Sequence, residues 1–143
     1  MQEFIQFLSN NPMLSITWIV IAGMLVHSVV KAKISGFKPL SSQDAILLIN
    51  KQDAIVVDVR AVDEYKKGHI VDAKNITLSQ IEQGNFTEIE NKKETPIILV
   101  CESGARSSSA ANKLAKAGFT QVYNLTTGMS GWAAANLPTT TKR

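Results

Sequence analysis

Residues 96–107 read PIILVCESGARS, a short apolar run that leads through a polar loop into a helix-forming segment. The run Pro96–Val100 has the length and the unbroken hydrophobicity of a strand buried on both faces of a sheet. The segment Arg106–Ala117 favours a helix, which Gly118 ends. Cys101, the one cysteine of the chain, therefore stands where a buried strand gives way to a helix.

The flanking sequence alternates between strand and helix in the same way. Strands are predicted at Ala54–Val59, after a loop within Ile70–Ile76, and at Gln121–Asn124. Helices or helical turns are predicted from Ser41 or Ser42 to Asn50, at Val62–Lys67, at Leu78–Gln83 and at Gly131–Ala135. This order is typical of a parallel sheet with helices on both sides, where binding sites lie at the carboxyl ends of the strands. The cysteine falls at such an end.

The loop after the cysteine has the composition of an anion-binding nest. A tight loop there directs successive backbone N–H groups at one point, and the following helix adds its positive end. Arg106 adds a full charge, so we expect Cys101 to be a low-pKa nucleophile. Gly104 supplies backbone freedom, and Ser107 either donates a hydrogen bond or caps the helix. From the loop alone, a structural cysteine followed by an ordinary turn stays open. The predicted anion-binding loop comprises Glu102, Ser103, Gly104, Ala105 and Ser107.

Composition excludes several other kinds of site. A lone cysteine cannot form an intramolecular disulfide or a CxxC centre. His27 and His69 are the only histidines, so a structural zinc site would lack ligands and no metal is expected. The formal net charge of +3 comes without a Lys/Arg stripe interleaved with aromatics, so nucleic-acid binding is not expected.

Residues 13–30 form a second distinctive segment, MLSITWIVIAGMLVHSVV, which contains no Asp, Glu, Lys or Arg. Eighteen helical residues span about 27 Å, close to the hydrocarbon thickness of a bilayer. A buried core helix is the alternative, but such a helix would show an amphipathic stripe, and this run is apolar on every face. We therefore predict a transmembrane helix over 13–30.

The charges on either side of this run predict its orientation. The tail 1–12 has no basic residue, whereas Lys31, Lys33 and Lys38 follow the run, the reverse of a cleaved signal peptide. The lysines predict a single-pass protein of the cell (inner) membrane with its C-terminal part in the cytoplasm. The expected order is tail 1–12, span 13–30, basic linker 31–36, globular domain 37–138 and frayed tail 139–143.

Three blocks of the globular part resemble the rhodanese-like family, and the resemblance covers Phe37 to Pro138. The first is Val57-Asp58-Val59-Arg60, Glu64-Tyr65, Gly68-His69-Ile70, Ala73 and Asn75-Ile76; the second is the loop from Cys101 to Arg106; the third is Gly118-Phe119, Val122, Asn124-Leu125, Gly128-Met129 and Gly131-Trp132. A CxxxxR loop alone is weak, but the three blocks in this order are specific.

The resemblance implies a five-stranded parallel sheet and a ping-pong transfer of sulfur. Cys101 takes a sulfane sulfur from a donor, holds it as a persulfide in the ring of N–H groups, and passes it to a thiol acceptor. Arg106 is the second catalytic residue, and no metal or organic cofactor is implied. By the same resemblance Asp58 and Arg60 organise the structure, and His69 hydrogen-bonds a loop; a general base is the less favoured role of His69.

The sequence departs from the family pattern at three positions. Glu102 places a carboxylate beside the nucleophile, which should discourage dianionic donors such as thiosulfate in favour of protein-bound or neutral persulfides. Thr127 stands where the family often has a glycine before Gly128. Asn136 stands where a glycine often precedes the last proline, and asparagine tolerates a left-handed conformation.

Two further functions compete with sulfur transfer. A phosphatase on this fold needs five residues between Cys and Arg and usually a His before the Cys, whereas four residues intervene here and Val100 precedes Cys101. An arsenate reductase would need additional thiols. A membrane-tethered interaction module is a different class: Ser15, Gly23 and Ser28 fall near helical spacing and would suit contact with an integral membrane protein. Replacing the cysteine, or replacing the anchor, discriminates between these roles.

Overall fold

The computed structural model describes residues 11–34 and 36–141, with the side chains of residues 28–34 excepted. The chain divides into two compact units, Met1–Ser35 and Gly36–Arg143. Most of the predicted tail 1–12 and the last two residues of the predicted tail 139–143 lie outside the described residues.

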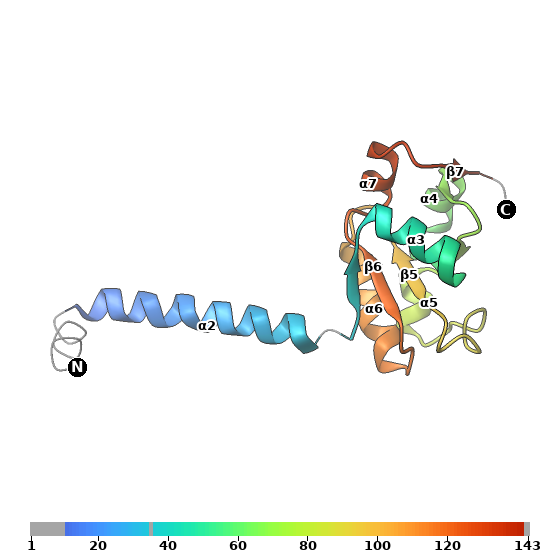
Figure 1. Cartoon of the computed structure of the whole chain (residues 1–143). Coiled ribbons are helices and arrows are strands. Elements are labelled where there is room, and N and C mark those ends of the chain that lie inside the picture. Colours follow the sequence, from blue (N-terminus) through green and yellow to red (C-terminus); the bar gives the residue numbers. More distant parts are fainter. Residues whose placement is uncertain (1–10, 35, 142–143) are drawn as a thin grey trace. The chain divides into compact units, whose positions relative to one another are not determined.

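The first unit contains helix α2, Pro12–Ile34 (Figure 1). The helix continues beyond Val30 into the predicted linker because residues 31–34 contain neither Gly nor Pro. Within the described residues, no helix is long enough and apolar enough to cross a bilayer. The predicted span reaches residues 28–30, whose side chains lie outside the described part.

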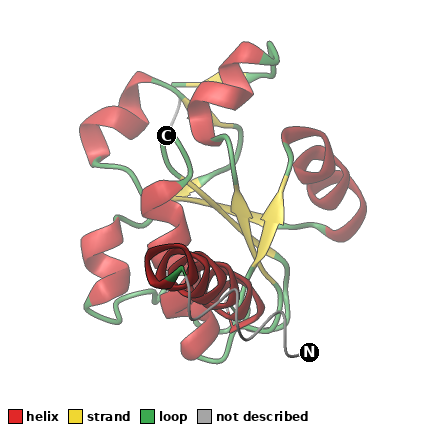
Figure 2. Cartoon of the chain, turned by 90° about the vertical axis from the view of Figure 1, so that its left-hand side faces the viewer, coloured by secondary structure: helices red, strands yellow, loops and turns green. Residues whose placement is uncertain are grey.

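The second unit is built on a parallel sheet of five strands in the order β1-β6-β5-β2-β4, which confirms the predicted fold (Figures 1 and 2). Its strands are β1 Lys38–Leu40, β2 Ile55–Asp58, β4 Lys74–Asn75, β5 Ile97–Val100 and β6 Val122–Leu125. Its helices are α3 Ser42–Gln52, α4 Val62–Lys67, α5 Leu78–Glu82, α6 Ala105–Lys116 and α7 Gly128–Ala134. A two-stranded antiparallel sheet pairs β3 His69–Ile70 with β7 Thr139–Thr140.

Strand β5 contributes to two hydrophobic cores, one on each face of the sheet. Ile97 and Leu99 pack in the core that includes Leu114 of α6. Ile98 and Val100 pack in the core that includes Trp132 of α7. Because successive side chains of a strand point to opposite faces, a central strand covered on both sides is apolar at every position. This is why PIILV is continuous rather than alternating.

The short strands β1, β3 and β7 were not predicted from the sequence. The prediction of a frayed tail is wrong for Thr139 and Thr140, which pair with Ile70 and His69. Strand β1 contains Pro39, which a strand tolerates at the edge of a sheet, where β1 lies. Strands of two or three residues are too short to show a period, so their tertiary partners decide them.

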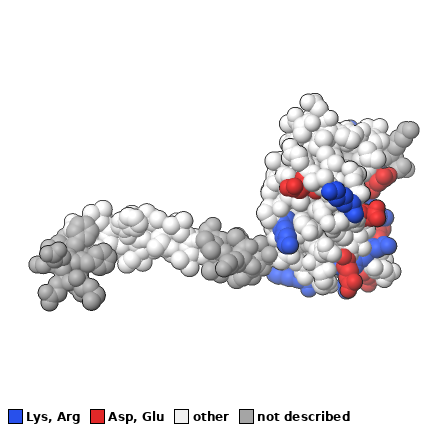
Figure 3. Space-filling view, viewed as in Figure 1, with Lys and Arg blue, Asp and Glu red and all other residues white. Residues whose placement is uncertain are grey.

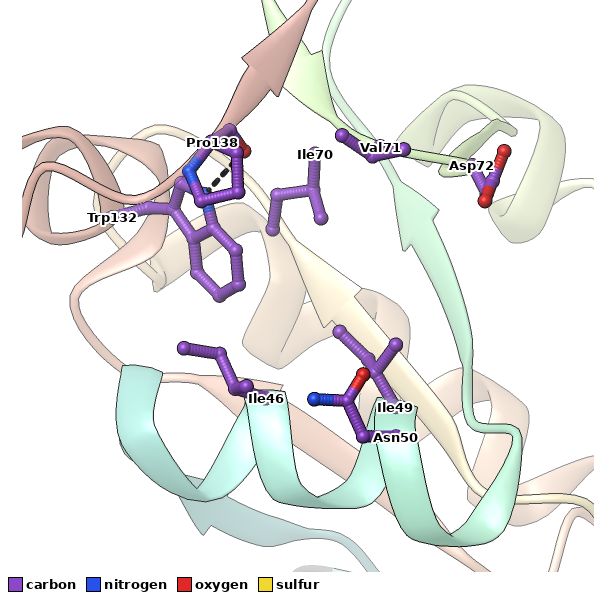
Figure 4. A pocket seen from close by; sticks show the side chains of 8 residues that line it. All are labelled: Ile46, Ile49, Asn50, Ile70, Val71, Asp72, Trp132 and Pro138. Carbon is purple, nitrogen blue, oxygen red and sulfur yellow. Dashed lines mark hydrogen bonds between the residues drawn. The ribbon is translucent and has the colours of Figure 1, made fainter.

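An apolar hollow of about 410 Å³ lies between α3, β3 with the segment after it, Trp132 of α7 and Pro138 (Figure 4). The indole Nε1–H of Trp132 donates to the carbonyl oxygen of Pro138 at 3.0 Å beside it. Its lining residues are Ile46, Ile49, Asn50, Ile70, Val71, Asp72, Trp132 and Pro138, so it is separate from the cysteine loop.

Candidate active site

Cys101 lies at the carboxyl end of β5, between the parallel neighbours β2 and β6. The thiol is free and the residue is 1% exposed. The start of α7 holds the backbone beside it: Met129 N–H donates to the Cys101 carbonyl oxygen at 2.8 Å, and Ser130 N–H donates to that of Glu102 at 3.1 Å. The backbone that carries the sulfur is therefore held by the sheet on one side and by the start of α7 on the other.

Hydrogen-bond donors surround the sulfur. Gly104 N–H donates to Sγ at 3.1 Å, and the Ser107 hydroxyl lies 3.3 Å from it. Burial raises the pKa of the Cys101 thiol, but the Ser107 hydroxyl and the N–H groups of Ser107, Ser103 and Gly104 lower that pKa by more, so it lies below its ordinary value. The loop thus directs hydrogen-bond donors at the sulfur, while its role in binding an anion stays a prediction.

Two glycines make this geometry possible. Gly104 has φ +92°, and a Cβ there would collide with the carbonyl oxygen of Thr126. Gly128 has φ +57°, and a Cβ there would lie 2.5 Å from the carbonyl oxygens of Cys101 and Glu102. Thr127 adopts φ −91°, which any residue adopts, so the missing glycine at that position costs nothing.

Arg106 lies on the first turn of α6, and its guanidinium has a carboxylate partner. It forms a bidentate ion pair with Glu64 of α4, with Nη1–Oε2 and Nη2–Oε1 both at 2.9 Å. The guanidinium lowers the pKa of Glu64 to about 2, and the carboxylate raises the pKa of Arg106. Glu64 is not predicted to belong to the site, because nothing in the sequence indicates a contact across 42 positions.

Arg60 is 5% exposed and ties three segments together. Its guanidinium donates to both carboxylate oxygens of Asp58, the shortest contact being 2.7 Å. It also donates to the carbonyl oxygen of Gly68 at 2.7 Å and to Oε2 of Glu102 at 3.2 Å. Arg60 therefore connects the end of β2 with the segment before β3 and with the cysteine loop.

Glu102 is held in place although its side chain is 51% exposed. Beside the contact with Arg60, its Oε1 accepts a hydrogen bond from the Ser130 hydroxyl at 2.9 Å. The carboxylate thus has a fixed position next to the nucleophile. Ser103 is exposed, and Ala105 opens α6.

His69 is buried and contacts Tyr65. Its Nδ1 lies 2.8 Å from the carbonyl oxygen of Tyr65, so Nδ1 carries the proton. The two rings stack with centroids 3.6 Å apart. These contacts tie α4 to β3, and the described hydrogen bonds of the cysteine sulfur do not include His69.

The sequence analysis also missed the part that Asn124 plays on β6. Its Nδ2 donates to the carbonyl oxygen of Gly104 at 3.2 Å, and its Oδ1 accepts from the Ser107 hydroxyl at 2.6 Å. Asn124 was noted only within a family block. An asparagine at the carboxyl end of a buried strand beside a reactive loop is the signal that would have found it.

A second hollow, of about 380 Å³, opens beside the loop. It is lined by Arg60, Glu64, Lys67, Gly68, Glu102, Met129, Ser130, Ala133 and Thr139. Both positive and negative side chains line it: Arg60 after β2, Glu64 and Lys67 of α4, and Glu102 of the cysteine loop. In the described ranges no group of three or more His, Cys, Asp or Glu side chains is placed to hold a metal ion.

The sequence model of the rhodanese-like domain matches residues 41–135. The chain belongs to the rhodanese-like family. It is 43% identical over 138 residues to the "Uncharacterized protein YibN" of Escherichia coli K12, covering 96% of each chain. It is 33% identical over 98 residues to the "Thiosulfate sulfurtransferase GlpE" of Coxiella burnetii, covering 68% of this chain and 89% of that one. Among solved structures it resembles the polysulfide-sulfur transferase homodimer of Wolinella succinogenes, with a TM-score of 0.63, 28% identity and coverage of 82% and 88%.

Proposed function

We propose that this rhodanese-like protein is a sulfurtransferase that carries sulfane sulfur as a persulfide on Cys101 and delivers it to a thiol. The observation that carries the proposal is the sulfur atom itself, which is buried at a strand end and has the Gly104 N–H at 3.1 Å and the Ser107 hydroxyl at 3.3 Å. The N–H groups of Ser103 and Ser107 also contribute to the lowered pKa of the thiol. Preorganised donors around one atom stabilise a charge that develops there. The relationship to a thiosulfate sulfurtransferase supports the same chemistry.

Each half of the reaction exchanges one S–S bond for another. In the first, the Cys101 thiolate attacks the sulfane sulfur of a donor persulfide; a new S–S bond forms, the donor's S–S bond breaks, and the donor thiolate leaves. In the second, an acceptor thiolate attacks the terminal sulfur and releases the Cys101 thiolate. The terminal sulfur carries negative charge between the two halves, so the donors that lower the pKa of the free thiol also stabilise the charged intermediate.

The charges around the loop favour a persulfide donor over thiosulfate. Arg106 is paired with Glu64, and Arg60 is paired with Asp58 and Glu102. A dianionic donor approaching the sulfur therefore meets guanidinium groups whose charge is already offset, together with the Glu102 carboxylate. Lys67 lines the same hollow and is the cation there for which no ion pair is described.

Intact-mass analysis tests the proposal. The wild type and Cys101→Ser are exposed to thiosulfate and, separately, to a small persulfide donor that carries no carboxylate. We expect the wild type to gain one sulfur atom, to lose it to cyanide or to excess thiol, and to load more readily from the persulfide; Cys101→Ser gains none. Failure of the wild type to load from either donor would refute the sulfur-carrier proposal and favour an interaction module.

Glu102→Gln tests the donor preference separately. Removing this half-exposed charge should increase the rate of loading from thiosulfate, while leaving that from the persulfide within about twofold. Glu88→Gln, on an exposed carboxylate that pairs with Lys74, is the matched control. Equal thiosulfate rates for Glu102→Gln and the wild type would show that Glu102 does not select the donor.

The proposal includes a membrane anchor over residues 13–30, with the rhodanese-like unit facing the cytoplasm. Support comes from the uncharged run and from the lysines that follow it. The hydroxyls of Ser15 and Thr17 donate to backbone carbonyl oxygens of α2, at 3.0 and 2.8 Å, which satisfies them within the helix. The described side chains of α2 include no Lys, Arg, Asp or Glu (Figure 3). The anchor would hold the sulfur carrier near a membrane-bound acceptor or an integral membrane partner.

A further inference from the structure

A chain of buried polar groups leads away from the cysteine sulfur. The Ser107 hydroxyl lies 3.3 Å from Cys101 Sγ and 2.6 Å from Asn124 Oδ1. The Asn124 Nδ2 donates in turn to the Gly104 carbonyl oxygen at 3.2 Å. All three side chains are at most 5% exposed, so water does not substitute for a missing partner.

The orientation of the Asn124 amide follows from its partner. The Gly104 carbonyl oxygen only accepts, so the amide must direct Nδ2 toward it and Oδ1 toward Ser107. Oδ1 also only accepts. The contact of 2.6 Å between Ser107 Oγ and Asn124 Oδ1 therefore requires the hydroxyl proton of Ser107.

Ser107 has one hydroxyl proton, and two neighbouring atoms can accept it, Cys101 Sγ and Asn124 Oδ1. While the proton points at Asn124, Ser107 Oγ presents a lone pair to the sulfur, and that lone pair accepts an S–H from the neutral thiol. A thiolate or a charged persulfide needs the hydroxyl proton itself. When the hydroxyl turns to the sulfur, Asn124 Oδ1 is left without a donor in a buried place.

We propose that Asn124 is a positioning residue that competes with the Cys101 sulfur for the single Ser107 proton and thereby restrains ionisation of the thiol. The competition makes Ser107 responsive: its hydroxyl points to Asn124 beside a neutral thiol and to the sulfur when charge forms there. The competition is a property of the folded loop. Its role in sulfur transfer, which is to time the stabilisation of charge on the sulfur, rests on the proposed function.

Charged groups around the loop come from four elements. Their described hydrogen bonds include neither Ser107 nor Asn124, the two side chains of the relay that leads away from the Cys101 sulfur. The charged groups are Arg106 on α6, Glu64 on α4, Asp58 and Arg60 at the end of β2, and Glu102 in the loop. No hydrogen bond between Arg106 and the sulfur is described, and the pKa of Arg106 is raised in part by the charge of Cys101. Within the described part of the chain, the side chains of Ser107 and Asn124 bond only to each other, to Cys101 and to Gly104.

The test measures the rate of Cys101 alkylation by iodoacetamide against pH in the full-length chain, which reports the pKa of the thiol without any sulfur donor. Asn124→Leu fills the same space without an acceptor and should lower the midpoint, increasing thiolate reactivity below it about three- to tenfold. Ser107→Ala should raise the midpoint. Ser108→Ala, which alters the neighbouring hydroxyl on α6, should leave it unchanged.

A double-mutant cycle separates the relay from a general disturbance of the loop. In a Ser107→Ala background, Asn124→Leu should produce a much smaller shift, because the route through the hydroxyl is gone and only the contact of Asn124 Nδ2 with the Gly104 carbonyl oxygen remains. An unchanged or raised midpoint in Asn124→Leu, or a shift of equal size in both backgrounds, would overturn the proposal. Asn124→Ala is measured in parallel, and thermal unfolding checks that each variant is folded.

A measurement on the wild type needs no change at Asn124. The side-chain amide resonances of Asn124 should shift with the midpoint of Cys101 alkylation, and Ser107→Ala should abolish the shift. Constant resonances across that midpoint would refute the relay. A chain that shows the relay but loads no sulfur would refute the proposed function alone, so the two failures are distinguishable.

Discussion

The sulfur of Cys101 has hydrogen-bond donors around it, while both guanidinium groups near it are already engaged by carboxylates. Arg106 faces Glu64, and Arg60 faces Asp58 and Glu102. Backbone N–H groups thus supply the stabilisation closest to the sulfur, as they do in oxyanion holes. A persulfide has one negative charge on one atom, which suits such a ring.

The ion pair between Glu64 and Arg106 makes stability depend on pH. The pKa of Glu64 in the folded chain is about 2, below the ordinary value of 4.5. The pair therefore stabilises the fold fully at pH values above 4.5. This stabilisation declines as the pH falls from about 4.5 toward 2. Because both side chains are more than a third exposed, we expect Glu64→Gln to reduce the unfolding free energy by only about 1 kcal/mol at pH 7.

Urea unfolding at pH 7, 5 and 3.5 measures this difference. The gap between the wild type and Glu64→Gln should be equal at pH 7 and 5 and smaller at pH 3.5. A gap that widens on acidification would contradict the assignment of the low pKa to Glu64. Glu82→Gln, on a carboxylate for which no ion pair is described, is the control and should show no gap.

Gly104 is predicted to be irreplaceable for the site. Gly104→Ala strains a left-handed backbone and brings a Cβ against the Thr126 carbonyl oxygen, so the loop must move and sulfur loading should fall at least tenfold. Gly84→Ala is the matched control: φ is +78° there, but the space is open. It should cost about 1 kcal/mol of stability and leave loading unchanged. Normal loading by Gly104→Ala would show that the N–H ring tolerates displacement.

At this scale the sequence predicts a residue's position better than its partner. The place of Cys101 at a strand end follows from PIILV and the helix after it. The pairing of Arg106 with Glu64 joins segments 42 positions apart, and only the packed fold brings them together. The role of Asn124 likewise depends on the orientation of a neighbouring loop.

Among the elements, the apolar strands β2 and β5 and the capped helices were predictable, whereas the short strands β1, β3 and β7 were not. The helix from Ser41 has a side-chain cap, with Asp44 N–H donating to Ser41 Oγ at 3.2 Å. Asn136 adopts φ +52°, as expected of an asparagine in place of glycine. By contrast, β7 exists because Thr139 and Thr140 find an edge at β3, which no local pattern encodes.

Trp132 holds Pro138, the residue before β7, through the hydrogen bond from its indole Nε1–H to the Pro138 carbonyl oxygen. Trp132→Phe keeps an aromatic ring in the core but removes the donor to the Pro138 carbonyl oxygen. We expect a loss of about 1 kcal/mol in the unfolding free energy and faster amide exchange in β7. Tyr123→Phe, on a hydroxyl for which no hydrogen bond is described, should stay within about 0.5 kcal/mol. Unchanged exchange in β7 would mean that its pairing with β3 suffices.

At the scale of the whole molecule, helix α2 differs from the rhodanese-like unit in the side chains that it exposes. The described part of this helix exposes large apolar side chains, among them Leu14, Ile16, Trp18, Ile19, Val20, Ile21, Leu25 and Val26. A surface of this kind is unfavourable in water and calls for a lipid or protein environment. The rhodanese-like unit has its own two cores, so we expect it to fold without residues 1–35.

Fractionation of cells tests the anchor. The full chain should sediment with membranes and resist carbonate extraction, whereas the chain 36–143 should stay in the supernatant and still load sulfur on Cys101. Ile19→Lys with Ile21→Lys is the matched control, because each charge near the middle of the run opposes insertion by about 3 kcal/mol. Membrane association by the double variant or by 36–143 would place the contact on the rhodanese-like unit. A full chain that remains in the supernatant would exclude the anchor, and α2 would then need a protein partner to cover it.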